Sequence, residues 1–212
     1  MPTGARTAYK IFLLSPARVT GKRAEMLLNP NASFDLASRL RDGQATIGEA
    51  FAFLSGLYFR GKLAYANKFA KTYRRMPGVW VITSGLGLLP AATQIRSQDL
   101  VTLGDVPIDP SNARYVQSLH SSANKLSLKL PKNCDVVLLG SIGTKKYAEL
   151  LVKIFDTRLK FPIDFVGRGD MSRGGLLLRS VADERELDYV PVIGAVRHGK
   201  RPPKLEPRYY NK

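Results

Sequence analysis

Residues 167–175 combine side chains and glycines that are suited to binding an anion. The stretch reads Gly-Arg-Gly-Asp-Met-Ser-Arg-Gly-Gly. Glycine lets the backbone adopt positive φ and approach a ligand closely, and arginine presents a planar fork of donors that matches phosphate and carboxylate. The pattern predicts a mobile loop built around an anion, in which Arg168 and Arg173 hold phosphate bidentately.

Asp170 and Ser15 are the two candidate catalytic residues. Asp170 stands between two arginines, which would keep its carboxylate ionised, so it is a candidate general base or electrostatic partner. The alternative is a salt bridge to one of these arginines that orders the loop. Ser15 follows an apolar run at residues 11–14, and the loops after strands are where open α/β sheets bind their ligands.

The charge of the chain indicates a polyanionic partner. Its 212 residues include 33 Lys and Arg against 17 Asp and Glu, for a formal net charge of +16. An excess of this size favours DNA or RNA. Residues 57–75 carry six basic residues and no acidic one, which predicts a track for phosphates. The predicted nucleic-acid contacts are Arg18, Lys22, Arg23, Arg60, Lys62, Lys68, Lys71, Arg168, Arg173, Arg197, Lys200 and Arg201.

Apolar runs and helical spacing predict the elements that position these residues. Buried strands are expected at residues 9–14, 78–83, 135–139 and 159–162. Helices are expected near residues 34–40, 47–54, 61–73, 110–120 and 147–155. Thr46 and Glu49 match a capping box for the second helix, and Asp109 followed by Pro110 is typical of a helix start. The last two strands and the helix between them predict a β-α-β unit with a parallel pair.

The pattern as a whole predicts an α/β fold in a single domain over residues 1–196. We expect a mixed, mostly parallel sheet flanked by helices, with a basic cleft. Residues 197–212 hold six basic residues, one acid and three prolines. They predict an extended basic tail that clamps a phosphate backbone or remains a disordered end.

Several classes of protein are disfavoured by the composition. Cys134 is the single cysteine, so we expect no internal disulfide, and its place in an apolar run predicts a small buried side chain. No Cys/His cluster has metal spacing, so neither a metal nor a cofactor is expected. No apolar stretch approaches ~18 residues, so we expect no membrane span. Residues 11–14 are too short for a secretory signal core, which favours the cytoplasm.

Two motifs resemble a known family. Residues 15–18, Ser-Pro-Ala-Arg, are similar to the Ser-Pro-Ala-Lys signature of the YaaA peroxide-stress family, and residues 168–173 resemble its Arg-Gly-x-Met-Ser-Arg motif. Residues 57–61 and 82–88 resemble segments of a related family of small uncharacterised proteins. The resemblance implies a mixed α/β fold with a basic cleft, DNA binding, and a part in the response to oxidative stress or DNA damage.

Two functions follow as hypotheses. The first is a DNA-binding protein that uses its basic cleft on the phosphate backbone. The second is an enzyme that modifies or excises a nucleic-acid base, with Asp170 and the neighbouring arginines at the site. Such an enzyme needs a pocket with a stacking plane, for which Tyr58, Phe59 and Trp80 are candidates, although Trp80 is more typical of a core. The basic tail favours a third reading, an RNA- or ribosome-associated protein.

Overall fold

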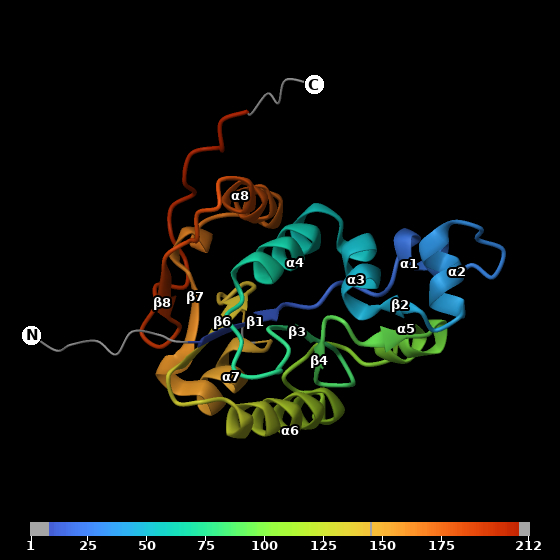
Figure 1. Cartoon of the computed structure of the whole chain (residues 1–212), viewed down its shortest axis with the longest axis horizontal. Coiled ribbons are helices and arrows are strands. Elements are labelled where there is room, and N and C mark those ends of the chain that lie inside the picture. Colours follow the sequence, from blue (N-terminus) through green and yellow to red (C-terminus); the bar gives the residue numbers. More distant parts are fainter. Residues whose placement is uncertain (1–8, 145, 208–212) are drawn as a thin grey trace, which may run out of the picture.

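The computed structural model describes residues 9–144 and 146–207. Within them the main sheet has the strand order β4-β3-β1-β6-β7-β8. Strands β3, β1, β6 and β7 run parallel, and β4 and β8 are antiparallel edges. The sheet confirms the predicted α/β class and the mixed, mostly parallel pairing (Figure 1). The strands are β1 (Tyr9–Leu14), β3 (Val79–Ile82), β4 (Leu88–Pro90), β6 (Cys134–Leu139), β7 (Leu159–Pro162) and β8 (Tyr189–Pro191).

Helices cover both faces of the sheet. α4 and α8 pack against each other on one face, and α6 and α7 lie on the other (Figure 1). A short antiparallel pair, β2 (Ala45–Thr46) and β5 (Gln94–Ile95), lies beyond the sheet with α1, α2 and α5. The helices are α1 (Lys22–Leu28), α2 (Asp35–Arg41), α3 (Ile47–Ser55), α4 (Leu57–Phe69), α5 (Ser97–Gly104), α6 (Ala113–Lys129), α7 (Ala148–Phe155) and α8 (Asp170–Ala182), with 3-10 turns η1 (Asp156–Arg158) and η2 (Ile163–Phe165).

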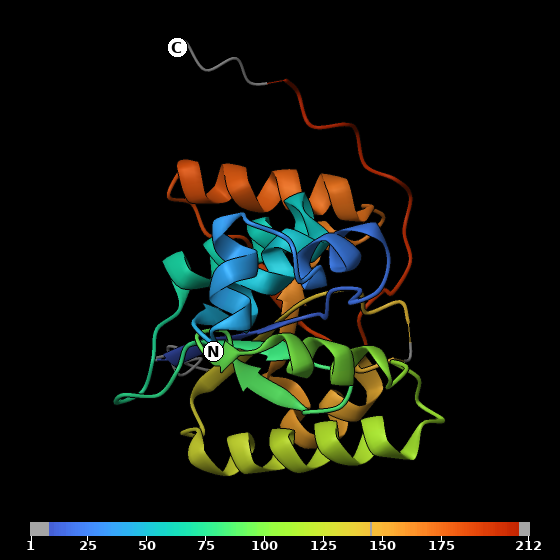
Figure 2. The ribbon, with the colours of Figure 1, turned by 90° about the vertical axis from the view of Figure 1, so that its right-hand side faces the viewer.

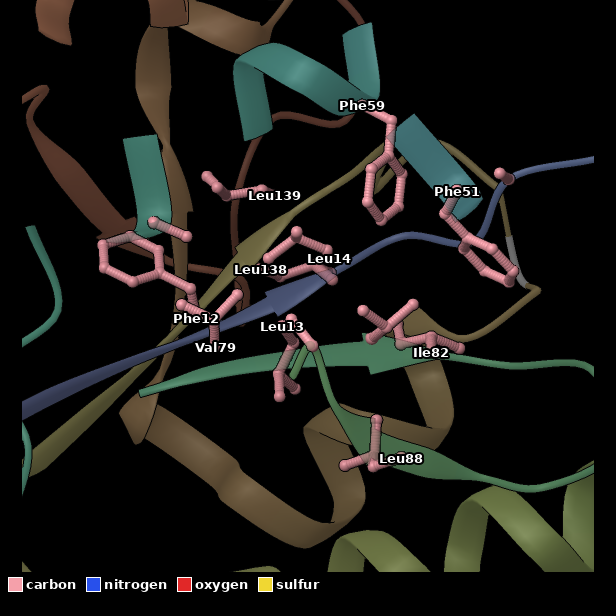
Figure 3. Packing of buried hydrophobic residues seen from close by; sticks show 14 of the residues in the cluster. Phe12, Leu13, Leu14, Phe51, Phe59, Val79, Ile82, Leu88, Leu138 and Leu139 are labelled. Carbon is pink, nitrogen blue, oxygen red and sulfur yellow. The ribbon is translucent and has the colours of Figure 1, made fainter. Parts of the chain in front are cut away.

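The core forms around β1, the strand between β3 and β6. Phe12 and Leu14 point to the face covered by α4, and Leu13 points to the opposite face (Figure 3). All three side chains are fully buried. A parallel strand covered on both faces has no solvent side, so its sequence is a continuous apolar run rather than an alternating one. This is why the strand could be recognised in the sequence.

The order of the strands creates a crevice at one edge of the sheet. The chain leaves β1 toward β3 on one side and later enters β6 on the other side. Connections that diverge in this way leave an opening outside the carboxyl ends of the strands, where α/β proteins bind ligands. Figure 2 looks toward this edge.

Two predicted helix starts shift, and each has a local reason. α4 begins at Leu57 rather than near Gly61, and Gly61 lies inside the helix, where it contacts α8. α6 begins after Asn112, whose Oδ1 accepts from the Tyr115 amide at 3.0 Å. Asp109 instead closes a turn by accepting from the Ser111 amide at 2.8 Å. The predicted capping box of α3 is confirmed.

Only residues 167–169 of the glycine-arginine stretch form a connecting loop, which corrects the prediction of a loop over residues 167–175. α8 begins at Asp170, so the second half of the stretch is helical. Gly174 lies against α4, and a Cβ at this position would come within 2.9 Å of the Tyr58 Cα. Gly167, at φ +72°, is the glycine of the stretch that needs the left-handed conformation. Gly167 therefore serves the turn and Gly174 serves the contact between the helices.

The described part of the basic tail is extended and lies on the domain. Residues 197–207 form no helix or strand. Arg168 Nη1 donates to the Pro203 carbonyl at 3.4 Å, and His198 lies against Gly143 of the loop after β6. The tail thus passes the amino-terminal end of α8 at the carboxyl edge of the sheet (Figure 2).

Candidate functional site

A cavity of about 590 Å³ opens at the carboxyl edge of the sheet. Three serines that follow neighbouring strands line it: Ser15 after β1, Ser84 after β3 and Ser141 after β6. Its position is the crevice between the diverging connections, which is the usual ligand site of such sheets. The remaining lining residues are Pro16, Ala17, Arg18, Val19, Thr20, Phe51, Ser55, Tyr58, Leu103, Gly104, Val106, Pro107, Ile108, Thr144, Lys146, Tyr147 and Asp170.

Lys62 is buried directly behind Ser15. Its Nζ donates to the Ser15 carbonyl oxygen at 2.7 Å and lies 2.8 Å from the Ser15 Oγ. The rings of Tyr58 and Phe59 flank the amine, with centroids 4.5 and 4.6 Å away. Lys62 is 1% exposed, and burial lowers the pKa of its amine to about 7, although the Asp170 charge acts in the opposite direction.

The burial of Lys62 corrects its predicted role as a phosphate contact. Position 62 falls on the side of α4 that carries Tyr58, Tyr65 and Ala66, which are also buried. The position of a lysine within such a stripe of apolar and aromatic side chains is the sequence signal for a buried amine. The partner of this lysine is Ser15, 47 residues away, so the pair emerges only in the folded chain.

The Tyr147 hydroxyl contacts the Ser15 side chain. The Tyr147 hydroxyl accepts from the Ser141 amide at 3.1 Å and also hydrogen-bonds with Ser15. Gly140 leaves the space for this contact, because a Cβ there would lie 2.7 Å from the Ser15 Cβ and 2.8 Å from the Tyr147 hydroxyl. Burial raises the pKa of Tyr147 and of Tyr58, so both hydroxyls stay protonated at neutral pH.

Tyr58 lines the cavity, but its hydroxyl is buried beside Arg173 of α8. Within the described residues this hydroxyl makes no hydrogen bond of normal geometry. A buried hydroxyl that is poorly partnered costs free energy.

Asp170 and Arg173 lie at the start of α8, beside the cavity. The Asp170 carboxylate is 3.5 Å from Arg173 Nη1, so the salt bridge that the sequence offered as the alternative role is present. The Asp170 side chain is 70% exposed, whereas that of Arg173 is 13% exposed. Arg173 donates through Nε and Nη2 to the Phe165 carbonyl at 3.2 and 3.0 Å. Its fork already binds protein, which corrects its predicted role as a free phosphate clamp.

Some of the predicted basic contacts gather beside α8. A groove of about 280 Å³ lies between the start of α8 and the tail, and we call it the tail groove. Arg168, Arg201 and Lys204 line it together with uncharged residues. Arg168 is held there by Ser172 Oγ at 3.2 Å. The uncharged lining residues are Gly169, Met171, Ser172, Pro202, Pro203 and Leu205.

Other predicted contacts lie elsewhere. The backbone of Lys71 pairs with Lys10, near the start of β1, so Lys71 belongs to the opposite edge of the sheet from the cavity. Lys68 forms an ion pair with Glu184. The predicted continuous phosphate track along residues 57–75 is therefore divided between a buried lysine, the helix surface and the far edge.

The remaining predicted contacts are mostly exposed. Arg18 lines the cavity and donates to Thr20 Oγ1 at 3.0 Å, and Arg23 donates to the Phe53 carbonyl at 3.0 Å. Arg197 pairs with Glu149 at 3.2 Å. The side chains of Lys22, Arg60 and Lys200 are exposed.

The stacking candidates also separate in the structure. Tyr58 lines the cavity, whereas Phe59 is fully buried in the core and does not line it. Trp80 is half-buried in β3, and its Nε1 donates to the Pro77 carbonyl at 2.9 Å. The prediction that Cys134 is buried is confirmed.

Within residues 9–144 and 146–207, no three His, Cys, Asp or Glu side chains gather as metal ligands would. The same residues include no helix with the length and apolar character needed to cross a bilayer. In comparisons with known proteins, the chain matches no family model, no curated protein and no solved structure. The resemblance to the YaaA family stays a prediction.

Proposed function

We propose that this protein binds nucleic acid, most simply DNA, through the phosphate backbone, with the tail groove as the principal contact. The observation that carries the proposal is the convergence of Arg168, Arg201 and Lys204 in one groove whose lining includes no acidic residue. Arg168 lies more than 30 positions before Arg201 and Lys204 in the sequence. The formal net charge of +16 adds a long-range attraction for any polyanion.

The tail groove suits a backbone better than a base. Its charged groups are the Arg201 guanidinium, the Lys204 ammonium and the Arg168 guanidinium, whose Nη1 also bonds Ser172 and Pro203. Phosphate oxygens are the ligands that such groups recognise. Contacts of this kind give affinity with little sequence preference. A part in the response to oxidative stress or DNA damage, which the family resemblance implies, belongs to the same proposal.

Binding to labelled single- and double-stranded DNA and RNA across a salt series tests the proposal. If the protein contacts several phosphates, its affinity should fall by orders of magnitude as the salt concentration rises from about 50 to 200 mM. The double variant Arg201→Gln/Lys204→Gln should weaken binding and flatten the salt slope. Lys71→Gln, at the opposite edge of the sheet, is the matched control and should change binding little. A flat salt response of the unaltered protein would contradict the proposal.

A second candidate function is base modification or base excision, and the cavity favours it. Gly169 lines the tail groove and Asp170, the next residue, lines the cavity, so a strand held in the groove would pass the cavity mouth. A cavity of about 590 Å³ that holds Tyr58 offers space and an aromatic ring for an extruded base. Mass spectrometry of oligonucleotides after long incubation tests this function. If the mass of the oligonucleotide stays unchanged, the protein binds nucleic acid without modifying it.

A further inference from the structure

We propose that Ser15 is a nucleophile activated by Lys62, and that the cavity catalyses acyl transfer from an ester or thioester that carries an anionic group. The chemistry rests on the cavity and not on the proposed binding of nucleic acid. It goes beyond base modification, which requires no covalent bond to the protein.

The arrangement of the two side chains is that of a nucleophile and its base. Ser15 Oγ lies 2.8 Å from Lys62 Nζ, within reach for direct proton transfer. The hydrogen bond from Nζ to the Ser15 carbonyl, at 2.7 Å, fixes the amine toward the same residue. Because Lys62 is 1% exposed while Ser15 lines the cavity, a substrate would meet the hydroxyl and not the amine.

The surroundings of Lys62 keep its amine available as a base. The aromatic rings of Tyr58 and Phe59 replace water around it. The charged groups that face it come from α8, where Asp170 raises its pKa and Arg173 lowers it, and burial outweighs both. Tyr58 and Tyr147 are the neighbouring titratable groups, and burial keeps both protonated. None of the ion pairs found in the described residues includes Lys62.

The Tyr147 hydroxyl supplies a donor for the reacting group. Tyr147 lines the cavity and its hydroxyl hydrogen-bonds with Ser15, next to the place where the oxygen of a bound acyl group would lie. A donor of this kind stabilises the negative charge that develops on a carbonyl oxygen under attack.

The reaction balances with water as the co-substrate. Ser15 Oγ forms a bond to the acyl carbon, its proton passes to Lys62 Nζ, and the bond from the acyl carbon to the alcohol or thiol breaks. A water molecule in the open cavity protonates the departing alkoxide or thiolate. The hydroxide that remains attacks the ester on Ser15 and releases a carboxylic acid, and Lys62 returns its proton to the Ser15 oxygen, which restores the serine.

The charges at the cavity define the substrate class. Arg18 and Lys146 line the cavity and are exposed, whereas Asp170 is the acidic residue of its lining. An anionic group on the ester or thioester would be held by these two cations. A cavity of about 590 Å³ accepts a small molecule with such a group attached.

The experiment uses an alkyl fluorophosphonate, which reacts with activated serines by losing fluoride. We expect one adduct per chain on Ser15 of the full protein, found by intact mass and peptide mapping. Below pH ~7 the labelling rate should increase about tenfold with each unit of rising pH, and above pH ~7 it should stay constant. The reason is that the reaction requires the neutral amine of Lys62. Ser15→Ala should abolish the adduct. Lys62→Met should slow it by about 100-fold or more.

Ser141→Ala is the matched control, because Ser141 lines the same cavity and, among the described residues, no hydrogen bond joins its hydroxyl to a lysine. It should keep the adduct. A folded protein that gains no adduct on Ser15, or an adduct whose rate does not change between roughly pH 6 and pH 8, overturns the proposal even if Lys62→Met fails to fold. The Arg201→Gln/Lys204→Gln variant should label normally, so a failure of nucleic-acid binding is distinguishable from a failure of this chemistry.

Discussion

Gly61 of α4 and Gly174 of α8 face each other where the two helices cross. A Cβ on Gly61 would come within 2.7 Å of the Gly174 carbonyl oxygen, so neither helix tolerates a side chain at this contact. α4 carries Tyr58 and Lys62, and α8 carries Asp170. The close approach of the two glycines therefore sets the distance between the groups on either side of the cavity.

Gly174→Ala should destabilise the protein by about 1–3 kcal/mol, because overpacking a tight contact forces the helices apart. Urea unfolding followed by circular dichroism measures the change. Gly175→Ala is the control, since its Cβ would meet Leu205 Cδ1 at an ordinary 3.5 Å. Alanine is the better helix former, so this neighbour should be neutral or stabilising by up to about 1 kcal/mol. Equal destabilisation by both would argue against the packing role.

Lys62→Met should raise stability most at pH ~7 and below, and the gain should shrink as the pH rises toward about 10. The folded-state pKa of Lys62, about 7, lies below that of an unfolded lysine, about 10.4. Between these values the unfolded chain binds more protons, so the stability of the unaltered protein increases with pH. The Lys62→Met variant has no amine at this position, so its stability lacks the pH dependence that Lys62 causes. Urea unfolding of both proteins at several pH values provides the comparison, and a difference that stays constant with pH would show that Lys62 is not perturbed.

Asp170→Asn should move the inflection of Ser15 labelling to lower pH. The Asp170 charge raises the pKa of Lys62, so its removal frees the amine at lower pH. DNA affinity should stay nearly intact or increase slightly, because a negative charge is lost. If the variant instead abolishes an oligonucleotide mass change that the unaltered protein produces, Asp170 acts in base chemistry. An unmoved inflection would place Asp170 too far from Lys62 to matter.

Deletion of residues 197–212 should weaken binding to both DNA and RNA, since it removes Arg201 and Lys204 from the tail groove. Parallel salt titrations of the two nucleic acids measure the loss. Equal losses would argue against a preference for RNA. A loss of affinity confined to RNA would favour the RNA-associated function instead. Unchanged affinity for both nucleic acids would show that the tail groove is not the binding surface.

The sequence by itself determined the sheet and several local features. Helices cover the parallel strands on both faces, so these strands have continuous apolar sequences that can be recognised without the structure. The capping box of Thr46 and Glu49 could be predicted because its partners are three residues apart. The strands at 135–139 and 159–162 with the helix between them give a local β-α-β unit, and the structure has it.

Tertiary structure decided the candidate site, because its contacts join residues that are far apart in the chain. The glycines of residues 167–175 predict a loop, yet Gly174 lies in α8, where α4 comes so close that a side chain would not fit. The sequence predicts Lys62 as a surface cation, whereas the fold buries it behind Ser15. Charge alone could not distinguish these environments, since a lysine has the same sequence signature whether water or two aromatic rings surround it.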